Sequence, residues 1–385
     1  MFGDMSGRQP LLQVKQDPRR PRRPAATAAL RNQVLLVAAG LALLAASLVL
    51  LYRRAPRQAA DDASSEEEQR DSERELQLLH EQPSSEFCAQ PPPLVCAHGG
   101  DAAAAPPNTA AAFRAALDGG ARCVEVDVAR TKDGQLVVLH TRELTQLLKL
   151  AGGSASSAAA AHGAPPPQVG DFTWRQLQAL RWPGGEGVET VEAVLHMVLP
   201  GTDHITLDVK TYGQAGEEVD EDAMAQAVVD LMRRTACRQC LVWAKSDAVV
   251  LQVKELDPQQ AVGYVVLNET AAARAAGMHR LLRIGSAEVV ALHYAMAADA
   301  AITAAARGAR KQVHAWTANT AGMMRSILDA GGAHAVVTNH PRKLQAAIDS
   351  RTRRCRQQEQ QEERQGKLHQ QQSERQQQQQ QADPG

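Results

Sequence analysis

Short apolar segments alternate with alanine-rich amphipathic segments from about residue 94 to residue 340. Short apolar segments without a polar interruption are typical of strands that are buried on both faces, as in parallel sheets. The alternation therefore predicts a parallel sheet with helices outside it. The strand candidates are residues 94–97, 123–128, 136–140, 205–209, 241–244, 262–267, 289–293, 313–317 and 335–338. The helix candidates are residues 109–118, 173–180, 188–198, 222–234 and 320–329.

The number of strand candidates bears on the fold class. A closed (β/α)8 barrel has eight strands, so one of the nine candidates is expected to be short or to lie outside the ring. The pattern by itself also fits an open, doubly wound sheet.

A second apolar pattern lies near the amino terminus. Residues 34–52 contain no charged side chain and have about the length of a membrane-spanning helix. Basic residues are concentrated before this segment, so the positive-inside rule predicts that residues 1–33 are a cytoplasmic tail. The large carboxy-terminal part would then be luminal or extracellular, as in a single-pass membrane protein. A cleaved signal peptide is the alternative, although the leader and the apolar run are both long for one.

Three further segments are defined by composition. Residues 53–93 form a polar linker, for which we expect no core, and the folded domain is expected to span residues 94–350. Residues 151–170, rich in Ala, Gly, Ser and Pro, predict a flexible insertion between the strand candidates 136–140 and 205–209, at the rim of the predicted sheet. The glutamine-rich residues 351–385 predict a tail that is disordered or weakly helical.

Charge, cysteine content and a sequon bear on the expected partners and location of the protein. The chain carries 42 Lys and Arg against 43 Asp and Glu, so its overall charge gives no reason to expect a nucleic-acid partner. Cys237 and Cys240 form a C-x-x-C pair without further ligands at zinc spacing, and they predict a local disulfide or two free thiols. Asn268 begins a single Asn-Glu-Thr sequon, which is weak support for a luminal or external location.

Glu125 and Asp127 are the most informative residues of the chain. They lie two apart in the strand candidate 123–128, so both side chains point to the same face of the strand. The valines around them indicate a buried position, where two adjacent carboxylates repel each other and lose hydration. A bound divalent metal is the simplest feature that offsets this cost.

Two histidines, His98 and His140, lie at the ends of strand candidates. Parallel barrels place their functional groups at the carboxyl ends of the strands, so we expect both histidines on neighbouring strands beside the carboxylates. Imidazoles beside a metal suit acid/base chemistry on a phosphate ester. Either histidine alone could equally well satisfy a helix end or a loop.

The order of the motifs resembles the glycerophosphodiester phosphodiesterase family over about residues 94–348. The motifs are Ala97-His98-Gly99-Gly100-Asp101, Pro106-Pro107-Asn108-Thr109, Glu125-Val126-Asp127, Thr131-Lys132-Asp133-Gly134, His140, Leu207-Asp208-Val209-Lys210, Ala315-Trp316-Thr317-Ala318-Asn319 and Val336-Val337-Thr338-Asn339-His340-Pro341. The His-Gly-Gly-Asp form, with Trp243-Ala244-Lys245-Ser246-Asp247 and Val262-Gly263-Tyr264, is similar to a divergent plant-type branch.

Four positions depart from the usual pattern of that family. Gly99 replaces the arginine that holds the substrate phosphate, and Pro107 replaces a glutamate. Thr141 stands where an aspartate follows the second histidine. Asp208 is shorter than the usual third metal-binding glutamate.

The resemblance implies a TIM-type (β/α)8 barrel that hydrolyses glycerophosphodiesters to an alcohol and sn-glycerol 3-phosphate, in lipid and glycerol metabolism. One Ca²⁺ or Mg²⁺ would be held by Glu125, Asp127 and Asp208, with His98 and His140 as the acid/base pair. Lys210, Lys245 and Trp316 would contact the substrate, and Lys245 is a candidate to replace the missing arginine.

Two other functions remain open at this stage. A lysophospholipase D or another phospholipase could be built on the same barrel, since an anchor through residues 34–52 would place the site near lipid. The departures at Gly99, Pro107 and Thr141 also fit a catalytically weak or inactive binding protein.

Overall fold

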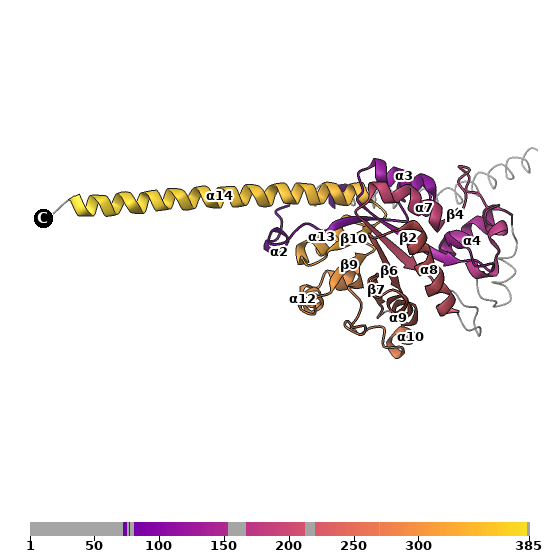
Figure 1. The fold of residues 1–385 in the computed structure, drawn as a ribbon. Helices are drawn as coiled ribbons and strands as arrows, with labels where there is room; N and C mark the ends of the chain where they lie inside the picture. Colours follow the sequence, from indigo (N-terminus) through magenta and orange to yellow (C-terminus); the bar gives the residue numbers. More distant parts are fainter. Residues whose placement is uncertain are drawn as a thin grey trace, which may run out of the picture. The chain divides into compact units, whose positions relative to one another are not determined.

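Eight parallel strands form a closed barrel in the computed structural model (Figure 1). In ring order they are β1 (Leu94–His98), β2 (Cys123–Arg130), β5 (His204–Val209), β6 (Cys240–Ala244), β7 (Ala261–Val266), β8 (Val289–His293), β9 (Gln312–Trp316) and β10 (Ala335–Thr338). β1 pairs with both β2 and β10 and so closes the ring. The prediction of a TIM-type barrel is confirmed, and the open sheet is excluded.

The structure describes residues 72–74, 77, 81–152, 167–211, 220–268 and 270–382. The proposed cytoplasmic tail, the apolar segment 34–52 and most of the predicted rim insertion lie outside these residues. Within the described ranges, no helix combines the length and the apolar character needed to cross a membrane.

The ninth strand candidate lies outside the ring. β3 (Leu136–Val138) pairs antiparallel with the end of β2 and with β4 (Glu189–Thr190). The turn between β2 and β3 is closed by the Thr131 amide, which donates to the Gln135 carbonyl at 2.9 Å. The expectation that His98 and His140 lie on neighbouring parallel strands is therefore wrong, because a turn this short permits only a hairpin.

Helices pack against the outside of the barrel, and several begin at a capping side chain. Thr109, Thr190, Ser246 and Thr320 each accept a backbone hydrogen bond three residues further on, which satisfies one of the free amides of the first turn. The helices are α2 (Ser85–Cys88), α3 (Ala110–Asp118), α4 (Thr141–Leu150), α6 (Trp174–Leu177), α7 (Val191–Val198), α8 (Glu221–Thr235), α9 (Asp247–Leu256), α10 (Ala271–Ala275), α11 (Tyr294–Ala297), α12 (Ala300–Gly308), α13 (Ala321–Ala330) and α14 (Pro341–Ala382), with 3₁₀ turns η1 (Val169–Asp171) and η2 (Leu199–Gly201).

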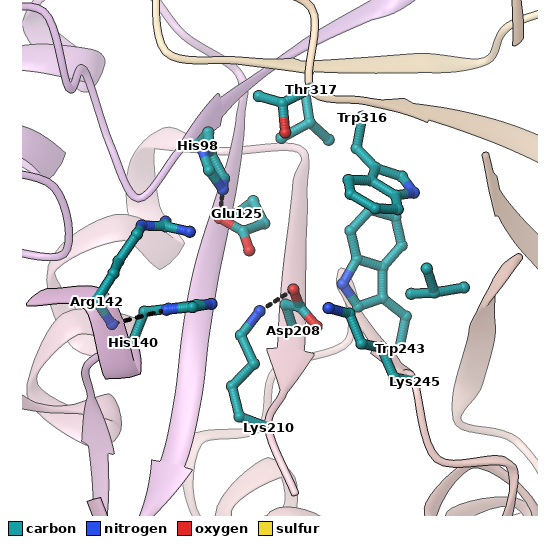
Figure 2. Close-up of a pocket in the computed structure, with 12 residues that line it drawn as sticks. His98, Glu125, His140, Arg142, Asp208, Lys210, Trp243, Lys245, Trp316 and Thr317 are labelled. Carbon is teal, nitrogen blue, oxygen red and sulfur yellow. Dashed lines mark hydrogen bonds and ion pairs between the residues drawn. The ribbon is translucent and has the colours of Figure 1, made fainter. Parts of the chain in front are cut away.

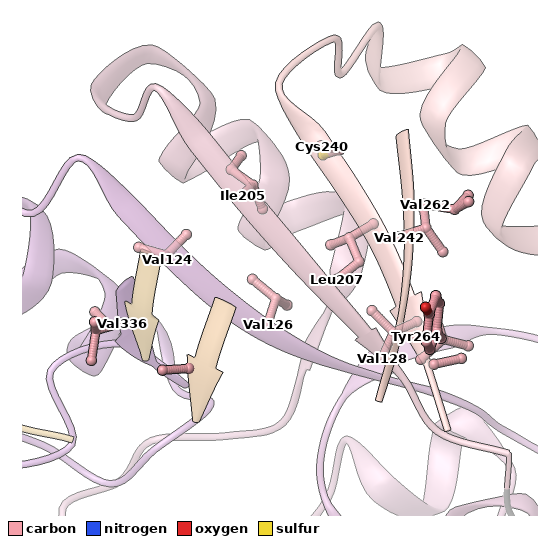
Figure 3. Packing of buried hydrophobic residues seen from close by; sticks show 14 of the residues in the cluster. Val124, Val126, Val128, Ile205, Leu207, Cys240, Val242, Val262, Tyr264 and Val336 are labelled. Atoms are coloured by element: carbon pink, nitrogen blue, oxygen red, sulfur yellow. The ribbon is translucent and has the colours of Figure 1, made fainter. Parts of the chain in front are cut away.

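Strand alternation separates the functional side chains from the main core. Glu125 on β2 and Asp208 on β5 line a pocket of the barrel (Figure 2). Their neighbours Val124, Val126 and Leu207 belong instead to the hydrophobic cluster between the strands and the helices (Figure 3). Because successive strand side chains point to opposite faces, the apolar layer fixes the direction of the carboxylates.

Three disulfides connect all six cysteines of the chain. Cys96–Cys123 joins the adjacent strands β1 and β2, and Cys237–Cys240 closes the short loop before β6. Cys88–Cys355 joins α2 to α14 across 267 residues. The structure thus pairs the C-x-x-C cysteines, and it adds two long-range bridges that the spacing of the cysteines did not indicate.

Two segments differ from the predicted domain plan. The linker was expected to carry no core, but Phe87 is buried in the main cluster. The tail from residue 351, predicted to be disordered or weakly helical, continues α14 to Ala382. Arg351 is fully buried, and its Nη1 lies 2.5 Å from Asp329 Oδ1. The helix persists beyond Cys355 because Gln, Glu, Lys and Arg are good helix formers, although their side chains are mostly exposed.

Candidate active site

A cavity of about 100 Å³ lies at the carboxyl ends of the barrel strands (Figure 2). Seven of the eight predicted site residues line it, and the eighth, Asp127, lies beside Lys210. The lining residues are His98, Glu125, His140, Arg142, Asp208, Lys210, Trp243, Lys245, Val265, Trp316, Thr317 and Val337. The structure therefore brings all eight predicted residues to one place.

The carboxylates of Glu125, Asp127 and Asp208 form a compact acidic cluster. One oxygen from each lies within 4.8 Å of the others. The pairing of β2 with β5 sets Asp127 opposite Asp208, so strand register creates the cluster. Oδ1 of Asp208 is buried without a hydrogen-bond partner among the described residues. Three oxygen donors, one of them with such a free atom, fit a hard cation such as Ca²⁺ or Mg²⁺.

Lys210 neutralises part of this negative charge. Its Nζ lies 2.6 Å from Asp127 Oδ1 and also hydrogen-bonds to Asp208. Burial acts to raise the pKa of Asp127, but the Lys210 ammonium outweighs it and holds that pKa below its ordinary value. Burial, followed by repulsion from both aspartates, holds the pKa of Glu125 well above its ordinary value. A proton or a cation bound at Glu125 would therefore stabilise the cluster.

Two loop segments orient the carboxylates. The Gly99 amide donates to Glu125 Oε2 at 3.0 Å, and Asn108 Nδ2 donates to Asp127 Oδ2 at 2.7 Å. Gly100, at φ +88°, follows Gly99, and a Cβ there would lie 2.5 Å from the Ala112 carbonyl carbon. The two glycines let the loop after β1 pass close to α3 and deliver an amide to the acidic cluster.

His98 is held in one orientation by asparagines. Its Nδ1 lies 2.6 Å from Asn339 Oδ1, while Nε2 faces Glu125 Oε2 at 4.0 Å. The Asn339 amide in turn donates to Asn319 Oδ1 at 2.8 Å. Burial lowers the pKa of His98, and the charge of Asp127 opposes this only in part. His98 is therefore neutral at neutral pH, with Nδ1–H donating to Asn339 and the Nε2 lone pair facing the acidic cluster.

His140 reaches the cavity as the N-cap residue of α4. Its Nδ1 accepts from the Arg142 amide at 3.2 Å, and its own amide donates to Glu143 Oε2 at 2.9 Å. Burial, together with the nearby charges of Lys210 and Arg142, lowers the pKa of His140 to about 4. The neutral ring, with Nδ1 accepting, carries its proton on Nε2.

The model of the glycerophosphoryl diester phosphodiesterase family matches residues 98–343 of the chain. The chain belongs to this family. It is therefore an enzyme of the phosphoric diester hydrolase class, and the resemblance found in the sequence is confirmed.

Individual relatives agree with this assignment. A glycerophosphodiester phosphodiesterase of Arabidopsis thaliana is 31% identical over 251 residues, which cover 63% of this chain and 70% of that protein. This similarity is consistent with the plant-type branch. The barrel resembles the structure of an Oleispira antarctica phosphodiesterase in complex with the product sn-glycerol-3-phosphate, with a TM-score of 0.53, 21% identity and coverage of 67% of this chain and 97% of that one. It also resembles a glycerophosphodiester phosphodiesterase from Parabacteroides distasonis, with a TM-score of 0.50, 17% identity and coverage of 67% and 97%.

Arg142, Trp243 and Asn339 are among the residues at the site of this family member that were not predicted as site residues. Arg142 and Trp243 line the cavity, and Asn339 holds His98. Trp243 could have been found from its place two residues before Lys245 on one strand face. The indication in the sequence was weaker for Arg142, which is a cation two residues after the predicted catalytic His140. Nothing local in the sequence links Asn339 to His98, because 241 residues separate them.

Proposed function

We propose that this chain hydrolyses glycerophosphodiesters to an alcohol and sn-glycerol 3-phosphate, with one divalent cation, Ca²⁺ or Mg²⁺, held by Glu125, Asp127 and Asp208. The observation that carries the proposal is a compact acidic cluster facing two histidines across one small cavity. The bound cation would lower the pKa of a substrate hydroxyl and offset charge on the phosphate.

The hydrogen bonds of the two histidines support different roles for them. His98 presents the Nε2 lone pair, so it takes the proton of the glycerol 2-hydroxyl. That oxygen attacks phosphorus to form a five-membered cyclic phosphate, and the bond from phosphorus to the departing alcohol breaks. His140 faces the same cavity and acts in its protonated form, in which Nε2–H gives its proton to the departing oxygen and the ring returns to the neutral state. Water then opens the cyclic phosphate to give sn-glycerol 3-phosphate.

The remaining lining residues position the substrate. Lys210 balances the charge of the two aspartates beside the phosphate site. Trp243 and Trp316 form an apolar wall for the carbon atoms of the glycerol. Lys245 is exposed at the rim of the cavity, where it is placed to attract the anionic substrate.

The proposal is tested by the release of sn-glycerol 3-phosphate from glycerophosphocholine by the purified full-length chain, with Ca²⁺, Mg²⁺ or EDTA. We expect metal-dependent release that falls by at least about 100-fold in Glu125→Gln, because a buried metal ligand is lost. Glu255→Gln is the matched control, since this side chain is exposed on α9. Lysophosphatidylcholine is assayed in parallel. Turnover of the lysolipid alone would identify a lysophospholipase D, and no turnover of either substrate would leave a binding protein.

We also propose that residues 34–52 anchor the protein in a membrane and that the barrel lies on the luminal or extracellular side. The three disulfides support an oxidising compartment, because such bridges are rare in the cytosol. The sequon residue Asn268 is exposed, as an acceptor of glycan must be. Treatment of the protein from its native cells with a glycosidase tests this: a shift in mass that Asn268→Gln abolishes is expected. In intact vesicles, labelling of barrel residues from the cytoplasmic side would contradict the proposed orientation.

A further inference from the structure

Arg142 occupies a place in the cavity that none of the predicted roles covers. It is the second residue of α4, directly after the N-cap His140 and Thr141, and its side chain is about half exposed (51%). In Figure 2 its guanidinium points toward the space between His98 and His140. Any phosphate that both histidines can reach must therefore pass close to this cation.

The contacts of the guanidinium leave part of it available. Nε donates to Glu143 Oε1 at 2.7 Å, and Nη2 lies 3.9 Å from Asp127 Oδ2, beyond hydrogen-bond distance. Among the described residues, Nη1 has no hydrogen-bond or ion-pair partner. Glu143 is itself buried and also accepts from the His140 amide, so one carboxylate fixes Arg142 and His140 together. The guanidinium is thus pre-oriented with donors directed at the cavity.

The other two cations of the cavity are less suited to hold a phosphate. Lys210 is engaged by Asp127 and Asp208, which neutralise its charge. Lys245 is exposed and offers a point charge without the planar pair of donors that matches two phosphate oxygens. Arg142 alone combines proximity to both histidines with a bidentate donor face.

The loop after β1 is a poor place for such a side chain in this protein. Gly99 has φ +60°, which strains any residue with a Cβ. That Cβ would also lie 3.1 Å from the Asn108 amide nitrogen and 3.2 Å from Pro107 Cβ. A cation for the phosphate therefore has to come from another element, and α4 supplies one.

We propose that Arg142 binds the substrate phosphate through its Nη groups, taking over the anion-binding task that Gly99 cannot perform. This inference rests on the proposed function, because it assumes a phosphodiester substrate at this cavity. Glu143 is the positioning residue that holds the guanidinium in the required orientation.

The experiment compares Arg142→Ala and Arg142→Lys with wild type in the full-length chain, with Arg114→Ala as matched control. Arg114 is exposed on α3 and outside the cavity. A charge-assisted hydrogen bond to an ion is typically worth one to two powers of ten in affinity, so we expect Arg142→Ala to lower kcat/KM by about 100-fold. Arg142→Lys should recover only part of the loss, and added methylguanidinium should partly restore Arg142→Ala but not Glu125→Gln.

Binding of sn-glycerol 3-phosphate, measured by titration calorimetry, separates this inference from the proposed function because it requires no turnover. We expect the dissociation constant to rise about tenfold or more in Arg142→Ala and to stay unchanged in Arg114→Ala. A change of less than threefold in both the affinity and kcat/KM would overturn the inference. Lost turnover with unchanged affinity would also overturn it, since Arg142 would then act only by holding His140.

Discussion

The disulfide between Cys88 and Cys355 gives a quantitative test of how the ends of the barrel domain are held. It closes a loop of 267 residues, whereas Cys237–Cys240 closes one of 3. In the loop-entropy description, a crosslink stabilises by restricting the unfolded chain, and the effect grows with the logarithm of loop length. The relation gives about 5.6 kcal/mol for the long loop and about 1.6 kcal/mol for the short one, a difference of about 4 kcal/mol.

The two bridges can be removed in parallel. We expect Cys88→Ala/Cys355→Ala to lower the free energy of unfolding by about 4 kcal/mol more than Cys237→Ala/Cys240→Ala does. Urea unfolding followed by tryptophan fluorescence measures this. The four tryptophans, Trp174, Trp182, Trp243 and Trp316, all lie between residues 94 and 350, so the signal reports on the barrel domain.

Two outcomes of the unfolding experiment would contradict this prediction. Equal losses in the two double variants would show that the length of the closed loop does not set the stabilisation. No loss in the first variant would show that Phe87 and the buried part of α14 hold the domain ends without the bridge.

Further predictions concern the site and its loops. Burial raises the pKa of Glu143 to about 7, above its usual 4.5, so the stability that this group contributes is fully present below pH 4.5 and is lost as pH rises through 7. Urea titration should show the wild-type unfolding free energy falling by about 3 kcal/mol relative to Glu143→Gln between pH 4.5 and 7.5. The same pH dependence of the unfolding free energy in both proteins would contradict this. Gly100→Ala should cost about 2 kcal/mol more in unfolding free energy than Gly120→Ala; both have positive φ, but only the first Cβ would meet the backbone at Ala112. Lys210→Met should destabilise the metal-free protein by about 3 kcal/mol, because the buried Asp127 and the partly buried Asp208 lose their cation, and Ca²⁺ should reverse part of the shift in melting temperature; unchanged melting in EDTA would refute this.

The pattern of side chains was enough to identify the local elements and much of the site. Period-two alternation placed Glu125 and Asp127 on one strand face, and continuous apolar segments predicted every strand of the ring. These signals are local, because each depends on residues within one element.

The tertiary structure decided what depends on distant parts of the chain. Strand register sets Asp127 against Asp208, and ring closure brings Asn339 to His98. The β2–β3 hairpin carries His140 into the cavity from outside the parallel ring. None of these contacts leaves a periodic trace in the sequence, because each depends on which strands pair and in which register.

The long-range disulfides and the carboxy-terminal helix also depend on contacts that the sequence pattern did not predict. Composition described residues 351–385 as a polar tract, but the buried Arg351 and the bridge at Cys355 depend on α2, more than 260 residues earlier in the chain. The sequence alone predicted the alternating strands, the acidic pair and the two histidines, and its resemblance to a known family predicted the barrel. Only the folded chain set Lys210 against Asp127, Asn339 against His98 and Arg142 beside the cavity, because these placements depend on packing between elements rather than on spacing within one.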